Sequence, residues 1–231
     1  MPPAASAAFV ESHLRSTLLA AAGDEAVRNL CASARQLQFD IPTLLCAAGS
    51  PASHLYYVVE GSIELVARRA GGDEFVVSYV AQGGWATWLN CFMNVPAEHD
   101  LCSSAHASLI ALPVGTVRSF CEHHPQVYPG IIQHIGRRMR LVLEWTGQSA
   151  MAGPAQRMAK LLHVMAMEQN PGATQATIRM TQARLASLAR CSRQTANALI
   201  AELQGQGLVR AAYGRYELPD LAVLAAFAAG E

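Results

Sequence analysis

Three side chains that suit base recognition lie close together near the C-terminal end of this chain: Arg193, Gln194 and Asn197. The apolar residues around them recur at helical spacing. Arginine can donate two hydrogen bonds to guanine, and glutamine or asparagine can exchange two with adenine. The pattern therefore indicates that bases are read in the major groove of DNA.

Two short helical patterns, about a turn apart, position these side chains. The second opens at Ser192, a residue type favoured as an N-cap. The residues expected to form the buried faces are Leu185, Leu188, Ala196, Leu199, Ile200 and Leu203. The three polar side chains then occupy the outer face of the second helix, as in a helix-turn-helix. A helical hairpin with a solvated polar face is the alternative.

The residues after the second helix predict a stop followed by a small hairpin. Gln204-Gly205-Gln206-Gly207 supplies glycine for a left-handed cap. Two short strands, 208–212 and 216–218, then flank a turn at Tyr213-Gly214-Arg215. Helices followed by a basic hairpin are typical of a winged helix, and such a wing would place Arg215 near a phosphate.

Charge separates along the 231-residue chain although the net charge is zero. Residues 154–231 carry eight Arg and Lys against five Asp and Glu, and residues 1–153 carry nine against twelve. The positive part is therefore the part predicted to bind DNA. Hydrophobic residues make up 52% of the chain, which is typical of a folded globular protein. We expect a cytoplasmic location without membrane contact, because we find no leader and no apolar run of membrane length.

Six cysteines are scattered without a Cys-x-x-Cys pair, so we expect reduced structural thiols and no metal site. One alternative function is a thiol-dependent hydrolase that uses Cys102 or Cys121 with a nearby histidine. Such a site needs a nucleophile, a base and an orienting group in contact. Because the sequence shows no nucleophile turn, phosphate loop or His-Glu-x-x-His motif, we do not expect an enzyme.

The N-terminal part predicts a helical segment at 9–37 and then an antiparallel sandwich or roll. Short β-type runs at 55–59, 62–67, 74–80 and 101–112 alternate with turn signals, including one at 71–73. A short helix is expected at 117–121. We assign residues 1–125 to this domain.

Residues 126–153 form a long helix and a hinge, and residues 154–231 form the winged-helix domain. Apolar and polar residues on the long helix follow heptad spacing, which predicts pairing with a second copy: Ile132, Ile135, Met139, Val142, Thr146 and Ser149. One face of an ordinary core helix is the alternative. Gly153-Pro154 ends the long helix, and Pro154 begins the next one.

This order, and several local strings, resemble the CRP/FNR family of bacterial regulators, which includes the catabolite activator protein. The similar strings are residues 55–62, 78–83, 137–139, 191–195 and 203–209. The resemblance implies an α+β fold with a jelly-roll-type, cyclic-nucleotide-binding-like β-roll, a long dimerisation helix and a C-terminal winged helix-turn-helix. It also implies a homodimeric transcription regulator with a near-palindromic DNA site.

Two departures from the family concern its known ligands. Where cyclic-AMP-binding members hold ribose and phosphate, this chain has Thr87-Trp88-Leu89-Asn90 and Glu98-His99-Asp100. Without a cation, burial of a phosphate costs on the order of a few kcal/mol, so cyclic AMP is not the expected ligand. Cys31 and Cys46 lie too far apart in the sequence for the iron–sulfur motif of the oxygen sensors, so no such cluster is expected.

A third departure is Arg190, which stands where the turn of the motif usually has glycine. We expect a positive φ at a cost of roughly 1 kcal/mol, and a further contact to phosphate. The sensor region retains aromatic and apolar residues that, together with Arg138, form an effector pocket or merely fill one: Tyr79, Trp85, Trp88, Phe92 and Val142. Haem is a further alternative, since a single histidine suffices as axial ligand.

The expected function is sequence-specific transcription regulation by a homodimer that senses an effector. Arg193 is expected to read guanine, and Gln194 and Asn197 to make further base or water-mediated contacts. Phosphate contacts are expected from Thr181, Gln182, Ser192 and Thr195. The expected partners are double-stranded DNA, a second copy and RNA polymerase. The remaining alternative is a ligand- or haem-binding sensor of the same fold that acts through protein contacts.

Overall fold

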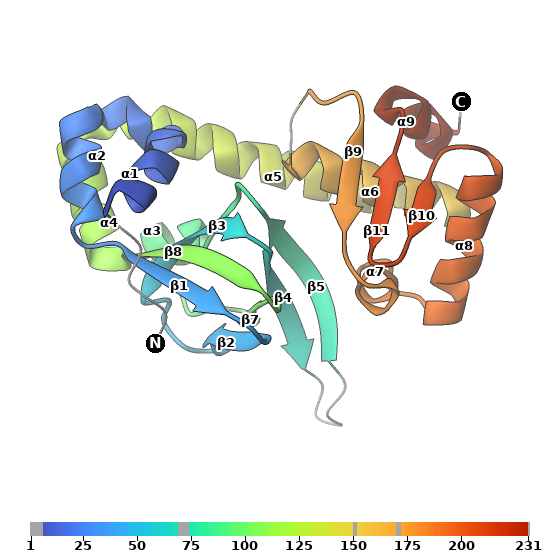
Figure 1. The fold of residues 1–231 in the computed structure, drawn as a ribbon, viewed down its shortest axis with the longest axis horizontal. Helices are drawn as coiled ribbons and strands as arrows, with labels where there is room; N and C mark the ends of the chain where they lie inside the picture. The colour runs from blue at the N-terminus through green and yellow to red at the C-terminus, as the bar shows by residue number, and fades with distance from the viewer. Residues whose placement is uncertain (1–6, 69–73, 150–151, 170–171, 231) are drawn as a thin grey trace. The chain divides into compact units, whose positions relative to one another are not determined.

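The computed structural model describes residues 7–68, 74–149, 152–169 and 172–230, apart from the side chains of residues 141 and 144–149 (Figure 1). The chain forms two compact units. The first comprises residues 1–74 and 78–136, and the second comprises residues 75–77 and 137–231. The predicted division into three segments stays a prediction, because both units share the long helix. None of the described helices has the length and apolar character needed to cross a bilayer.

Two four-stranded antiparallel sheets form the β-roll of the first unit. One has the order β1-β8-β3-β6 and the other the order β2-β7-β4-β5. The strands are β1 (Arg35–Phe39), β2 (Thr43–Cys46), β3 (His54–Glu60), β4 (Ser62–Arg68), β5 (Glu74–Ala81), β6 (Trp85–Ala86), β7 (Asp100–Ser103) and β8 (Ala107–Pro113). The antiparallel roll predicted from the sequence is therefore confirmed. The predicted turn at 71–73 lies outside the described residues.

Alternation along β3 and β8 separates two apolar cores, because successive side chains of a strand point to opposite faces. Tyr56 and Leu109 belong to a cluster with residues of the second sheet, between the two sheets. Tyr57 and Ile110 belong to a cluster with residues of the helices that cover the outer face of the first sheet. Both faces of that sheet are therefore buried.

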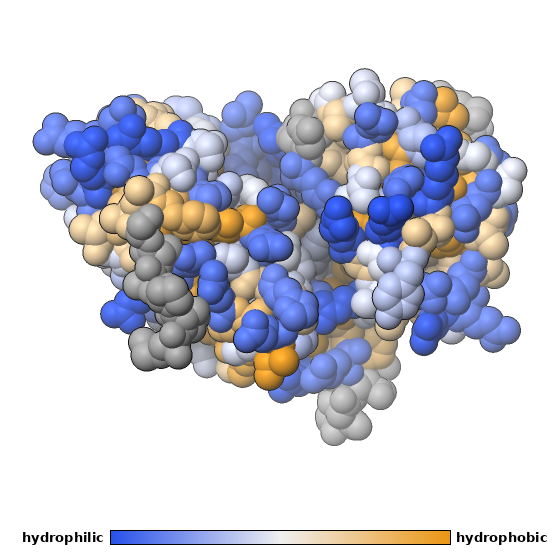
Figure 2. Space-filling view, viewed as in Figure 1, coloured by the Kyte–Doolittle hydropathy of each residue, from blue (hydrophilic) through white to orange (hydrophobic). Residues whose placement is uncertain are grey.

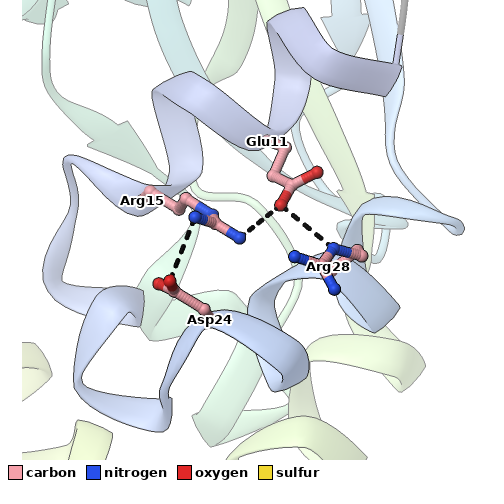
Figure 3. A network of polar contacts seen from close by, with 4 residues as sticks. All are labelled: Glu11, Arg15, Asp24 and Arg28. Carbon is pink, nitrogen blue, oxygen red and sulfur yellow. Dashed lines mark hydrogen bonds and ion pairs between the residues drawn. The ribbon is translucent and has the colours of Figure 1, made fainter.

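The covering layer contains α1 (Ala7–Arg15), the 3₁₀ turn η1 (Leu18–Ala22), α2 (Asp24–Cys31), α3 (Trp88–Met93), α4 (Val114–His123) and the 3₁₀ turn η2 (Pro125–Val127). Four charged side chains join α1 to α2 (Figure 3). Glu11 Oε1 lies 2.5 Å from Arg15 Nη2 and 3.3 Å from Arg28 Nε, and Arg15 Nη1 lies 3.1 Å from Asp24 Oδ2. This network aligns the two helices above their buried apolar faces.

The long helix is α5 (Tyr128–Ser149), so the predicted long helix is confirmed. Two residues of its heptad seam are strongly exposed, Ile132 at 68% and Met139 at 62%. Ile135, in contrast, packs partly against the core of the first unit. The side chains of Thr146 and Ser149, which complete the predicted seam, lie outside the described residues.

The second unit is a winged helix. It contains α6 (Pro154–Gln169), β9 (Ala176–Arg179), α7 (Gln182–Leu188), α8 (Arg193–Gly205), β10 (Arg210–Ala212), β11 (Arg215–Leu218) and α9 (Leu221–Ala229). The three strands form an antiparallel sheet of order β10-β11-β9. Helix α6 begins at Pro154, as the sequence predicted, and its buried face includes Met158, Leu162 and Met165.

Some sequence expectations were wrong in detail. The predicted helical segment at 9–37 is interrupted by η1, and its last residues already belong to strand β1. The hairpin turn is shorter than expected, because Arg215 begins β11 and pairs with Ala212. Strand β9 and helix α9 were not predicted.

The turn between β3 and β4 yields a stability prediction. Gly61 has φ +76°, and a Cβ there would lie 2.7 Å from Ser104 Oγ and 3.1 Å from Ala107 Cα. Gly83 has φ +81° with no atom within 4 Å of such a Cβ. We expect Gly83→Ala to lower the free energy of unfolding by about 1 kcal/mol through backbone strain. Gly61→Ala should cost roughly 1–3 kcal/mol more through the clash.

Urea unfolding followed by tryptophan fluorescence measures both variants against the wild type. Equal losses in the two variants would show that the Ser104 and Ala107 contacts contribute nothing.

Candidate nucleic-acid interface

The turn between α7 and α8 is closed by two backbone hydrogen bonds. The Arg190 N–H donates to the Ser187 carbonyl and the Cys191 N–H donates to the Ala186 carbonyl, each over 3.0 Å. This is the pattern of a Schellman cap, in which the residue after the helix adopts a left-handed conformation. Arg190 has φ +54°, so the predicted positive φ is confirmed. An arginine thus holds a position that glycine would occupy without steric cost.

A serine cap starts α8 directly after this turn. Ser192 Oγ accepts a hydrogen bond from the Thr195 backbone N–H over 3.0 Å, and the two hydroxyl groups lie 2.8 Å apart. Both side chains are exposed, so they can also meet a phosphate. The predicted N-cap at Ser192 is therefore confirmed.

The buried and exposed faces of α8 separate as its periodicity predicts. Ala196, Ile200 and Leu203 are buried against the rest of the unit. Leu199, which was expected to be buried, is half-buried. Arg193, Gln194 and Asn197 are exposed, and the surface over this end of α8 is largely hydrophilic in Figure 2. Among the described residues, the side chains of Gln194 and Asn197 have no partner, so they are available for a ligand.

A side-chain contact joins the N-terminal ends of α7 and α8. Gln182 Oε1 accepts from Arg193 Nη2 over 3.3 Å and from Nε over 3.4 Å. Thr181 caps α7 by accepting from the Arg184 N–H over 3.3 Å. The structure therefore brings together the predicted base-reading and phosphate-contacting residues of both helices.

The three-stranded sheet adds two guanidinium groups to this surface. Arg215 lies directly opposite Arg179 in the pairing of β11 with β9. Arg215 also forms an ion pair with Glu217 over 3.2 Å, whereas Arg179 has no ion-pair partner among the described residues. The sequence analysis missed Arg179. No local signal identifies it, because β9 has only four residues and the position of Arg179 depends on the pairing of β9 with β11.

The sheet is connected to the helical part of the surface through Arg179. This residue ends β9, two residues before the cap Thr181. In Figure 1, β9 and the β10–β11 turn point toward the same end of the unit as α7 and the start of α8. The elements that carry the exposed cations and hydrogen-bonding side chains therefore meet at one end of this unit.

Comparison with known proteins agrees with this architecture. Residues 37–124 match the model of the cyclic nucleotide-binding domain, and residues 156–227 match that of the Crp-like helix-turn-helix domain. Together the two models cover more than half of the chain. The CRP-like protein Clp of Xanthomonas euvesicatoria is 24% identical in an alignment of 195 residues that covers 80% of this chain and 84% of Clp.

This chain belongs to the CRP/FNR family of transcription regulators. Solved structures of the family share its fold. FixK2 of Bradyrhizobium japonicum has a TM-score of 0.68 at 13% identity, covering 83% of this chain and 95% of its own. The c-di-GMP responsive regulator CLP of Xanthomonas campestris has a TM-score of 0.59 at 22% identity, covering 84% and 98%.

The aromatic residues of the predicted effector pocket pack tightly in the first unit. The ring centroids of Trp85 and Trp88 lie 5.5 Å apart. The ring of Trp88 stacks on that of Phe92, with 5.8 Å between the centroids. Both tryptophans belong to the cluster that contains helix residues. The buried Trp88 Nε1 has no hydrogen-bond partner among the residues that the structure describes. These two rings therefore support the sheet from its outer face.

The other predicted pocket residues have different surroundings. Tyr79 is buried on β5, Val142 is 52% exposed on α5, and Arg138 Nη1 lies 4.0 Å from Glu168 Oε1. Because Arg138 and Val142 belong to the second unit and Tyr79 to the first, the effector pocket stays a prediction.

The region expected to depart from cyclic-AMP-binding members carries a buried carboxylate. Asp100, which is 7% exposed, accepts from the Ala48 N–H over 2.7 Å and lies 3.1 Å from Arg68 Nε. Its negative charge thus anchors the loop before β3 to the end of β4. A carboxylate with these partners is a structural group and does not attract a phosphate.

Burial affects the two cysteines that the sequence offered as candidate nucleophiles, Cys102 and Cys121. Burial raises the pKa of Cys121 to about 12, and burial together with Asp100 raises the pKa of Cys102. A reactive cysteine instead requires a lowered pKa. All six cysteines are free, and the described residues contain no group of three or more potential metal ligands.

The turn before α8 allows a direct measurement of backbone strain. We expect Arg190→Gly to be more stable than Arg190→Ala by about 1 kcal/mol, because only glycine adopts φ +54° without steric cost. Both variants lack the arginine charge, so the comparison isolates the backbone. Thermal unfolding measures the difference, and a more stable alanine variant would contradict the strain.

Proposed function

We propose that this CRP/FNR regulator binds a specific DNA sequence as a homodimer. The observation that carries the proposal is the exposed face of α8, where Arg193, Gln194 and Asn197 stand beside a ring of hydroxyl and guanidinium groups. Base-reading and phosphate-binding side chains thus occur on one surface, as DNA recognition requires.

Recognition by this surface would proceed through the N-terminal end of α8. Arg193 is positioned to donate to guanine, while Gln182 supports its guanidinium from the neighbouring helix. Gln194 and Asn197 supply base or water-mediated contacts. Ser192, Thr195, Thr181 and Arg190 surround them with donors for phosphate oxygens.

Dimerisation is supported by the exposed apolar residues of α5. Ile132 and Met139 are one heptad apart, and each leaves more than half of its surface in water. Packing of this stripe against α5 of a second copy would bury it in the geometry of a coiled coil. Two recognition helices related by a twofold axis then fit half-sites one DNA turn apart, ~34 Å.

Regulation would follow from a population shift. Residues between α5 and α6 connect the sensing and DNA-binding parts, so a change there alters the spacing of the two recognition helices. An effector acts by binding one spacing better than the other.

The effector is not cyclic AMP in this proposal. Trp88 and Asp100 occupy the regions where cyclic-AMP-binding members hold ribose and phosphate, and Asp100 is already paired with Arg68. An absorption spectrum and a native mass spectrum of the purified protein can identify a bound haem or small molecule. Titrations with cyclic AMP and c-di-GMP complete the test, since the Xanthomonas neighbour responds to c-di-GMP. Saturable binding of cyclic AMP would overturn this part.

We further propose that the protein acts by binding and not by catalysis, which the raised thiol pKa values support. Its DNA ligand places it in the cytoplasm, and regulation of transcription makes RNA polymerase a partner. The alternative sensor that acts only through protein contacts leaves the free polar groups of Gln194 and Asn197 without a role.

Selection of bound duplexes from a random-sequence pool, repeated over a range of salt concentrations, tests the function. We expect an enriched near-palindrome and a steep fall in affinity with salt, because bound phosphates release counterions. Binding without sequence enrichment would reject specific regulation.

Arg193 gives the first mutational prediction. We expect Arg193→Ala to lose ~1–3 kcal/mol of binding free energy and to relax the preference at one base position. Arg190→Gln is the contrast, because loss of a phosphate contact weakens all sequences equally and lowers the salt dependence. Equal losses of Arg193→Ala on selected and random duplexes, measured by gel shift, would refute base reading.

The exposed apolar stripe of α5, formed by Ile132 and Met139, gives the second mutational prediction. We expect the double variant Ile132→Gln, Met139→Gln to shift the sedimenting species from dimer to monomer, because glutamine preserves helix propensity but removes the apolar contact. DNA affinity should fall with it. Gln133→Ala, on an exposed neighbouring position, is the control and should stay dimeric. A dimeric double variant would exclude α5 as the interface.

A further inference from the structure

The tip of the wing carries a fully exposed aromatic ring. Tyr213 lies in the turn between β10 and β11 and is fully exposed, at 106% of the reference value. Its neighbours are Ala212 and Gly214, and Gly214 has φ +70°. The small neighbours and the tight turn leave the whole ring projecting into solvent.

Positive charge is concentrated directly behind this ring. Arg215 follows the turn and lies opposite Arg179 on β9. Like charges directly opposite each other destabilise a strand pair. Glu217 neutralises Arg215 in part, over 3.2 Å, but Arg179 keeps its charge uncompensated by any ion pair within the described part of the chain. An anion held between these two groups would remove the repulsion.

The wing tip also belongs to the surface that contains the recognition helix. Arg179 precedes the cap Thr181 by two residues, and Gln182 next to it accepts from Arg193 at the start of α8. A duplex that receives α8 in its major groove therefore passes Arg179 and Arg215 at the groove edge. Beyond that sugar–phosphate strand lies the minor groove.

We propose that the wing is a second DNA-reading element, in which Tyr213 enters the minor groove flanking the site read by α8. Arg179 and Arg215 bind the phosphates of the strand between the two grooves. This inference rests on the proposed DNA binding and adds a base preference outside the major-groove site.

The chemistry of the minor groove specifies that preference. An A·T pair presents only acceptors there, whereas G·C adds the 2-amino donor of guanine. A phenolic hydroxyl can donate to the adenine N3 or thymine O2 atom, and the ring fits where no amino group protrudes. Tyr213 therefore favours A·T over G·C in the flank.

A protein partner is the competing occupant of an exposed tyrosine. The two guanidinium groups behind the ring favour a polyanion, and the connection to Arg193 places that polyanion in line with the recognition helix. The observations thus favour the same duplex over a separate protein.

The test uses the full-length protein and duplexes selected from a random pool, with the selected core held constant. One flanking pair at a time is changed to A·T, G·C or inosine·cytosine, which removes only the 2-amino group from the minor groove. For the wild type we expect A·T and inosine·cytosine to bind alike, and about tenfold more tightly than G·C at the contacted position. Tyr213→Ala should bind all three flanks equally and keep the core preference.

Two further variants separate the parts. Arg179→Gln should weaken all flanks equally and lower the salt dependence while the A·T preference persists. Val223→Ala, an exposed apolar residue on α9, should bind as the wild type does. Thermal unfolding of Tyr213→Ala should be unchanged, because the ring is fully exposed.

The outcomes assign each failure to its source. A flank preference that survives in Tyr213→Ala overturns the inference, as does inosine·cytosine that binds like G·C. Failure of the wild type to select any core sequence overturns the proposed function itself.

Discussion

The burial of one face of α8 is the constraint on which the DNA-binding surface depends. Ala196, Ile200 and Leu203 are held in the interior, so Arg193, Gln194 and Asn197 must face outward. Both ends of the helix are closed by local hydrogen bonds. Ser192 caps its start, and at its end the Leu208 N–H donates to the Leu203 carbonyl over 3.0 Å while Gly207 takes φ +73°. These bonds fix where the helix begins, and therefore which side chains occupy its first turn.

In the β-roll, an aromatic side chain and a carboxylate from the predicted effector region take part in packing. Trp88 is only 3% exposed, and its ring contacts both Trp85 and Phe92. Asp100 joins two loops through an arginine and a backbone amide. Trp88 and Asp100 thus contribute to the packing of the sheet and its connections.

Much of this architecture could be predicted from the sequence, because local patterns determine it. Heptad spacing, the serine cap and the glycine stop identify α5 and α8, and turn signals identify the strands β3, β4 and β5. Strand β9 was not predicted, because four residues are too few to show the alternation of a strand. Helix α9 is apolar on nearly every position, so its sequence lacks an amphipathic pattern.

The residues of the candidate site also fall into those that local sequence patterns predict and those that they do not. Residues of α7 and α8 were predictable because the motif is contiguous, and the left-handed Arg190 was predictable because the turn demands it. Arg179 was not, since only the register of β9 against β11 places it beside Arg215. The exposure of Tyr213 likewise depends on the length of the hairpin turn, which is shorter than the sequence pattern predicted. Long-range pairing is therefore the information that local patterns lack.

The side chains of Gln194 and Asn197 form no hydrogen bonds with other described residues, and both are exposed. Replacement of either leaves the caps and the buried face of α8 intact. Under the proposed function, single mutations at these two positions would change the operator preference without loss of stability. The residues that fold the helix are then separate from those proposed to read DNA, so target genes can diverge while the fold persists.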